Sequence, residues 1–72
     1  MDLETLKQIL EAGSELVWQF QGENYSLMKE RDGRYSLTHQ GKLKRYASLG
    51  EIAEEGIDVM AMVKDNRTLF VY

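Results

Sequence analysis

His39 is the only histidine in the sequence and the first residue to consider for acid–base chemistry. Ser36 and Thr38 lie close to it along the chain and are the hydroxyl groups that it could activate as nucleophiles. Alternation along a strand, however, places positions 36 and 38 on the face opposite to position 39. We therefore interpret His39 as a histidine of a turn or a sheet edge, and we expect that the protein is not an enzyme.

Four carboxylates, Glu51, Glu54, Glu55 and Asp58, have helical spacing and could together hold a hard cation. Their spacing is not that of an EF-hand loop, so we interpret them as a solvated helix face. The sequence has no cysteine, which excludes thiolate zinc sites. Its glycines are spaced as turn formers and do not form a phosphate-binding motif. The sequence therefore predicts neither a metal site nor a cofactor.

The one basic cluster comprises Lys42, Lys44 and Arg45, and Tyr46 follows it directly. Cations beside aromatic rings on strands can bind single-stranded nucleic acid, because bases stack on the rings while the cations contact the backbone. Weak single-stranded nucleic-acid binding by the basic strand 42–46 is therefore one hypothesis.

Two observations argue against nucleic acid. Alternation places Trp18, Tyr25 and Tyr35 on the same face as the strand leucines, so these rings are expected in the core and only Tyr46 points outward with Lys44. The formal net charge is −3, whereas nucleic-acid-binding domains are usually basic. We prefer to interpret the cluster as a charged edge that discourages strand-to-strand aggregation.

The chain has 72 residues, which predicts a single small domain spanning residues 1–72. A domain of this size buries a small core, so oligomerisation or good packing must compensate. The longest apolar run, VMAMV, is far shorter than a membrane span, and the charged N-terminus is not a signal peptide. We expect a cytoplasmic protein that makes no membrane contact.

The first element is expected to be a helix that Asp2 caps and Gly13 ends in a left-handed conformation. Its apolar residues recur at helical spacing and form one stripe, which comprises Leu3, Leu6, Ile9 and Leu10. This stripe must pack against the remainder of the domain.

A four-stranded antiparallel meander is predicted next, with strands near 15–21, 25–30, 34–38 and 42–46. The expected inner face carries Leu16, Trp18, Phe20, Tyr25, Leu27, Tyr35, Leu37 and Leu43. The expected outer face carries Gln19, Ser26, Glu30, Ser36, Thr38 and Lys44.

The registers of the meander follow from keeping apolar faces together. A two-residue turn at Gly22-Glu23 sets Leu27 opposite Trp18. Three-residue loops over 31–33 and 39–41, each ending in glycine, set Leu37 opposite Leu27 and then opposite Leu43.

A short second helix is expected between Ser48, which forms a capping box with Glu51, and Gly56. A C-terminal β-hairpin then follows, with its turn at Asp65-Asn66 in KDNR. Residues 57–63 also fit helical spacing, so a continuation of the second helix remains an alternative for this segment. The fold class is α+β.

The predicted hairpin is apolar on both faces, and one face must be covered by something else. That face carries the candidate protein interface Met60, Met62, Leu69 and Val71. Methionines suit an adaptable binding surface, and an edge strand can pair with a partner strand. The sequence therefore favours a small, non-enzymatic intracellular protein-interaction module, whose partner is another protein or a second copy that associates through the hairpin.

Overall fold

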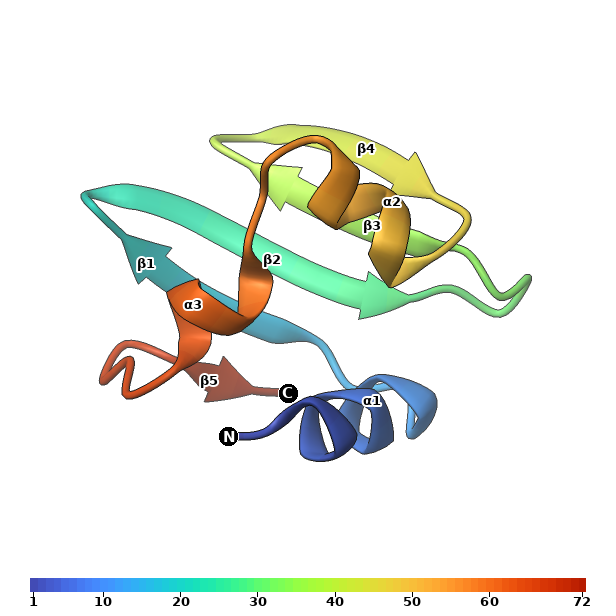
Figure 1. Ribbon diagram of the computed structural model, residues 1–72, viewed down its shortest axis with the longest axis horizontal. Helices are drawn as coiled ribbons and strands as arrows, with labels where there is room; N and C mark the ends of the chain where they lie inside the picture. The colour runs from blue at the N-terminus through green and yellow to red at the C-terminus, as the bar shows by residue number, and fades with distance from the viewer.

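The computed structural model describes residues 1–72 and shows an α+β fold, as predicted (Figure 1). An N-terminal helix, an antiparallel meander of four strands, two short helices and a C-terminal strand follow one another along the chain. The elements are α1 (Leu3–Glu11), β1 (Leu16–Phe20), β2 (Glu23–Lys29), β3 (Tyr35–His39), β4 (Lys42–Tyr46), α2 (Leu49–Glu54), α3 (Val59–Val63) and β5 (Phe70–Val71).

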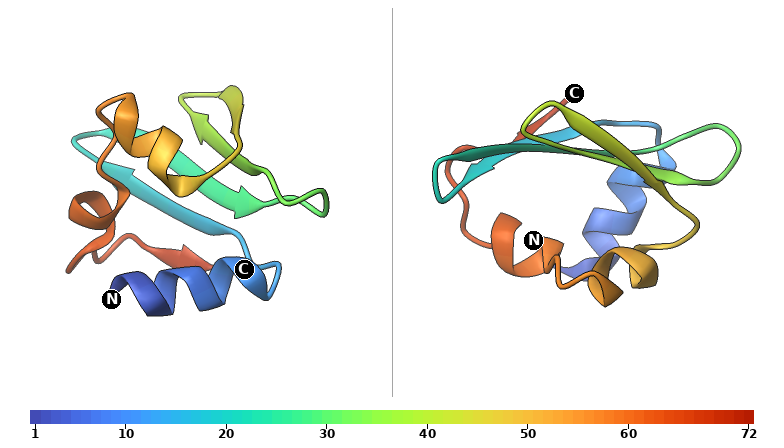
Figure 2. Two further views of the ribbon diagram at one scale, coloured as in Figure 1. Left: turned by 45° about the vertical axis from the view of Figure 1, so that its right-hand side comes forward. Right: turned by 90° about the horizontal axis from the view of Figure 1, so that it is seen from above.

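The five strands form one sheet in the order β4-β3-β2-β1-β5. All three helices lie on one side of this sheet, and its other face is uncovered (Figure 2, right). The core fills the space between the two layers, and its buried apolar residues are Leu6, Leu10, Leu16, Trp18, Leu27, Leu37, Tyr46, Ile52, Val59, Met62 and Val63.

The predicted caps of α1 are present. The side chain of Asp2 accepts a hydrogen bond from the backbone N–H of Thr5 at 2.8 Å, and this bond lowers the pKa of Asp2. Gly13 follows the helix with a φ of 83°, and the N–H of Ser14 reaches back to the carbonyl of Ile9. The helix therefore begins and ends where its sequence predicts, with Leu6 and Leu10 buried.

The β2–β3 register is confirmed. Leu27 lies opposite Leu37, and Tyr25 lies opposite His39. Gly33 adopts a φ of 91° in the loop, a conformation that glycine reaches without strain.

The β1–β2 turn lies one residue earlier than predicted, and this shifts the register of the two strands by two residues. Its central residues are Gln21 and Gly22, with φ values of 52° and 79°, so Trp18 lies opposite Tyr25 rather than Leu27. Two positive φ values give the turn a twist that matches the twist of the flanking strands. Because the shift is an even number of residues, the inner-face residues of both strands keep their predicted side.

The β3–β4 register is wrong by one residue, and this error exchanges the two faces of β4. The turn is formed by Gln40 and Gly41 alone, so Leu43 lies opposite Thr38 and Tyr46 lies opposite Tyr35. Leu43 is consequently on the uncovered face with 52% of its surface exposed, whereas Tyr46 is 5% exposed in the core.

Lys44, which was expected on the outer face, shares the helix-covered side with Leu37. Its long aliphatic stem can follow the apolar surface while its ammonium group stays at the edge of the sheet.

The first strand of the predicted hairpin is a helix. Residues Val59–Val63 form α3, which Asp58 caps by accepting a hydrogen bond from the N–H of Ala61 at 3.1 Å. Gly56, with a φ of 83°, separates α3 from α2, so α3 is not a continuation of the second helix either. The helical form places Val59, Met62 and Val63 together in the core.

Only the last strand of the predicted hairpin is present, and it pairs with β1, where Val71 lies opposite Leu16. The segment before it is fixed by Asn66, whose side-chain amide donates hydrogen bonds to the carbonyl of Gln19 at 2.8 Å and to that of Met62 at 2.9 Å. One asparagine thus connects the sheet to α3.

Candidate functional site

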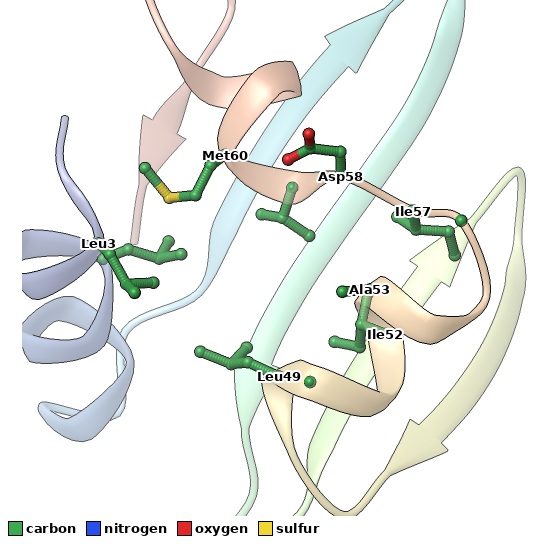
Figure 3. Close-up of a pocket in the computed structure, with 11 residues that line it drawn as sticks. Leu3, Leu49, Ile52, Ala53, Ile57, Asp58 and Met60 are labelled. Carbon is green, nitrogen blue, oxygen red and sulfur yellow. The ribbon is translucent and has the colours of Figure 1, made fainter.

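A groove with a volume of about 490 Å³ opens among the three helices (Figure 3). Eight of the eleven residues that line it are hydrophobic, and its size lies within the ~300–1,000 Å³ range of ligand pockets. The lining residues are Leu3, Leu6, Leu49, Gly50, Ile52, Ala53, Gly56, Ile57, Asp58, Val59 and Met60.

The groove has a buried floor and a partly exposed rim. Leu6, Ile52 and Val59 are buried and belong to the core, so the floor is fixed by packing. Leu3 of α1 and Met60 of α3 reach toward the space between the helices in Figure 3, as does Leu49 of α2.

Leu3 is 47% exposed, and Leu49 and Met60 are half-buried. Because each rim residue still has surface in contact with water, covering the groove would bury further apolar area and release free energy, at roughly 25 cal/mol for each Å².

The lining contains one ionisable side chain, that of Asp58. Its carboxylate already accepts the hydrogen bond that caps α3, and it has no ion-pair partner. The remainder of the lining is apolar or glycine, so the groove offers apolar surface rather than a set of cooperating acid–base groups. What the groove can do chemically is bind an apolar group.

The four residues of the sequence-predicted interface do not form one surface. Met60 lines the groove, but Met62 is buried in the core with 7% of its surface exposed. Leu69 is half-buried against the core, and Val71, which is 50% exposed, lies on β5. The two-faced hairpin that motivated this interface is absent, because Met60 and Met62 are on a helix.

The basic strand is largely neutralised within the protein. Lys44 forms an ion pair with Glu55, and Arg45 forms one with Glu30 at 2.9 and 3.0 Å from Nε to the two carboxylate oxygens. Lys42 is exposed and has no such partner.

Tyr46 is buried rather than presented for stacking. Its hydroxyl donates a hydrogen bond to Glu55 at 3.1 Å, and burial raises the pKa of Tyr46. The hydrogen bond from Lys44 lowers the pKa of Glu55 and raises that of Lys44. The structure therefore does not bring the four residues of the basic strand onto one accessible surface.

His39 forms part of an aromatic stack across three strands. Its ring lies 4.3 Å from that of Tyr25, which in turn stacks on Trp18 at 5.5 Å. Nε2 of His39 lies 2.8 Å from a carboxylate oxygen of Glu23. Ser36 is on the opposite face of β3, so the structure places no nucleophile beside the histidine on its own strand.

The carboxylates of Glu51, Glu54, Glu55 and Asp58 do not converge. No three histidine or acidic side chains in the structure are grouped so that they could hold a metal ion. Glu51 accepts a hydrogen bond from the N–H of Ala47, and Glu55 is turned toward Lys44.

Comparison with models of protein families, with curated proteins and with solved structures finds no match to this chain. None of its helices has the length and apolar character needed to cross a membrane. The assignment of function therefore depends on the groove itself.

Proposed function

We propose that this protein is a small, non-enzymatic protein-interaction module that binds its partner in the groove among α1, α2 and α3. One observation carries the proposal: Leu3, Leu49 and Met60, from three different helices, converge on one apolar groove and keep part of their surface exposed. Contiguous exposed apolar surface that is rimmed by polar residues is typical of interaction sites.

The chemistry of the lining also supports binding rather than catalysis. The groove presents apolar side chains and a single carboxylate that is already engaged in a helix cap. We further propose that the protein acts in the cytoplasm, since a chain without cysteine suits a reducing compartment.

Leu3 and Leu43 provide a matched pair of variants for the test. Both are leucines with about half of their surface exposed, but Leu3 is on the rim of the groove and Leu43 is on the uncovered face of the sheet. We expect Leu3→Ser to reduce the recovery of a co-purifying partner about fivefold or more, which corresponds to roughly 1 kcal/mol of lost apolar burial.

The measurement is quantitative mass spectrometry of proteins that co-purify with the tagged protein from its native cell. The partner should remain bound to Leu43→Ser at the wild-type level. A partner that is retained by Leu3→Ser but lost from Leu43→Ser would place the interface on the sheet and refute the groove.

A further inference from the structure

We propose that the groove accepts an amphipathic α-helix that carries basic residues beside its apolar face. This inference rests on the proposed function, because it names the class of partner that the same groove would bind. Three features of the molecule support a basic helix: the elements that border the groove, a glycine in its lining, and the charge of the helical layer.

The elements that border the groove favour a helical ligand. The groove lies among three helices, and neither edge strand, β4 or β5, contributes a residue to its lining. An extended peptide would find no strand edge there to pair with, and its backbone groups would lose water without gaining partners. A helix satisfies its own backbone hydrogen bonds and needs only an apolar surface to pack against.

The glycines in the lining allow a partner to approach closely. Gly50 lies in the first turn of α2, and a side chain added there would meet only the hydroxyl of Ser48, at 3.6 Å. Because Gly50 has no side chain, the backbone of α2 is open to contact at this point of the groove. The separation of packed helices depends on the size of the side chains between them, so a glycine permits tight packing.

The charge of the helical layer indicates whether a partner should be positively or negatively charged. The three helices with their capping residues, 2–12 and 48–64, contain seven acidic residues and two basic residues, Lys7 and Lys64. Glu11 and Glu55 are paired with Lys29 and Lys44 of the sheet. The acidic residues that remain without an ion pair are Asp2, Glu4, Glu51, Glu54 and Asp58.

Five such carboxylates against two lysines give the helical layer a net negative charge, and Asp58 among them lines the groove. Complementary charge on a partner accelerates its association and discriminates against acidic competitors. A helix with lysine or arginine next to its apolar face matches both the shape and the charge of this layer.

The test uses three synthetic helical peptides that share one leucine-rich apolar face and differ only in flanking residues, which are lysine, glutamine or glutamate. The binding of each peptide to the full chain is measured by calorimetry and by backbone amide NMR shifts. We expect the lysine peptide to bind about tenfold or more tightly than the glutamate peptide at low salt, with the difference shrinking as salt screens the charges. The largest shifts should occur at the residues that line the groove.

Two outcomes would overturn the inference while leaving the proposed function intact. The first is equal or tighter binding of the glutamate peptide, with all three affinities reduced by Leu3→Ser, because the groove would then bind proteins without selecting basic ones. The second is that the lysine peptide does not bind, although Leu3→Ser still removes the natural partner. The natural ligand would then not be a basic helix.

Gly50→Gln separates binding from folding. Glutamine is a better helix former than glycine, so the variant should melt at the wild-type temperature or above. Because Gly50 lines the groove, we expect the glutamine side chain to enter it and the lysine peptide to bind about tenfold or more weakly. The control is Ala47→Gln, an exposed position just before α2 and outside the groove, which should bind as wild type. Wild-type affinity for Gly50→Gln would show that the helix does not lie where we place it.

Discussion

Replacing Met62 with lysine should unfold the protein. Met62 is 7% exposed and packs in the core together with Val59 and Val63, its neighbours in α3. An ammonium group at this position would lose its water without gaining a carboxylate partner, which costs about 3 kcal/mol or more. A small domain has a total stability near the lower end of ~5–15 kcal/mol, so most of it would be lost. The measurement is urea unfolding followed by circular dichroism.

Ala61→Lys is the matched control, because Ala61 is the residue before Met62 in the same short helix and is exposed. We expect it to change the free energy of unfolding by no more than about 0.5 kcal/mol. If Met62→Lys instead remained folded and only dissociated an oligomer, α3 would be misplaced and Met62 would belong to the interface that the sequence predicts.

The second large effect is expected at Tyr46. Tyr46→Ala should destabilise the protein by about 3 kcal/mol or more, because it empties a buried aromatic position on β4. Leu43→Ala, three residues earlier on the same strand, should cost no more than about 0.5 kcal/mol because Leu43 is on the uncovered face. Urea unfolding of the two variants under identical conditions checks both values.

This pair of variants decides the β3–β4 register. A three-residue loop over 39–41 would bury Leu43 and expose Tyr46, whereas the turn at Gln40 and Gly41 does the reverse. If Leu43→Ala lowered the free energy of unfolding more than Tyr46→Ala, the register predicted from the sequence would be the correct one.

The fold was predictable wherever one arrangement alone kept an apolar face intact. Between β2 and β3, only the three-residue loop sets Leu27 opposite Leu37, and the structure has that loop. Between β3 and β4, both loops end in Gly41, and the strand offers a choice between burying Leu43 and burying Tyr46. The ring of Tyr46 is larger, and the stem of Lys44 tolerates the helix-covered side, so the register with Tyr46 inside is preferred.

The segment 57–63 was ambiguous for a different physical reason. A five-residue helix is not stable alone and forms only because its apolar side packs against the core. The local sequence therefore does not strongly predict a separate helix here. The one local signal was Asp58, which has a residue type favoured at helix N-caps and in fact caps α3.

The groove could not be predicted from the sequence, because it depends on how three separate helices are placed on the sheet. Leu3 was correctly placed on the apolar stripe of the first helix, but helical spacing does not tell which end of a stripe remains uncovered. Of the four residues predicted as an interface, Met60 alone lines the groove.

If the proposed function is right, a partner protein occupies the groove among the three helices. The most direct measurement introduces a photoreactive amino acid at Ala53, which lines the groove and is exposed, and identifies cross-linked proteins after illumination in the native cell. The comparison position is Ala61, which is also exposed in the helical layer but does not line the groove. We expect a discrete cross-linked partner from position 53 that disappears in the Leu3→Ser background and is absent from position 61. Equal cross-linking from both positions, or a product at position 53 that Leu3→Ser leaves unchanged, would show that the partner does not bind in the groove.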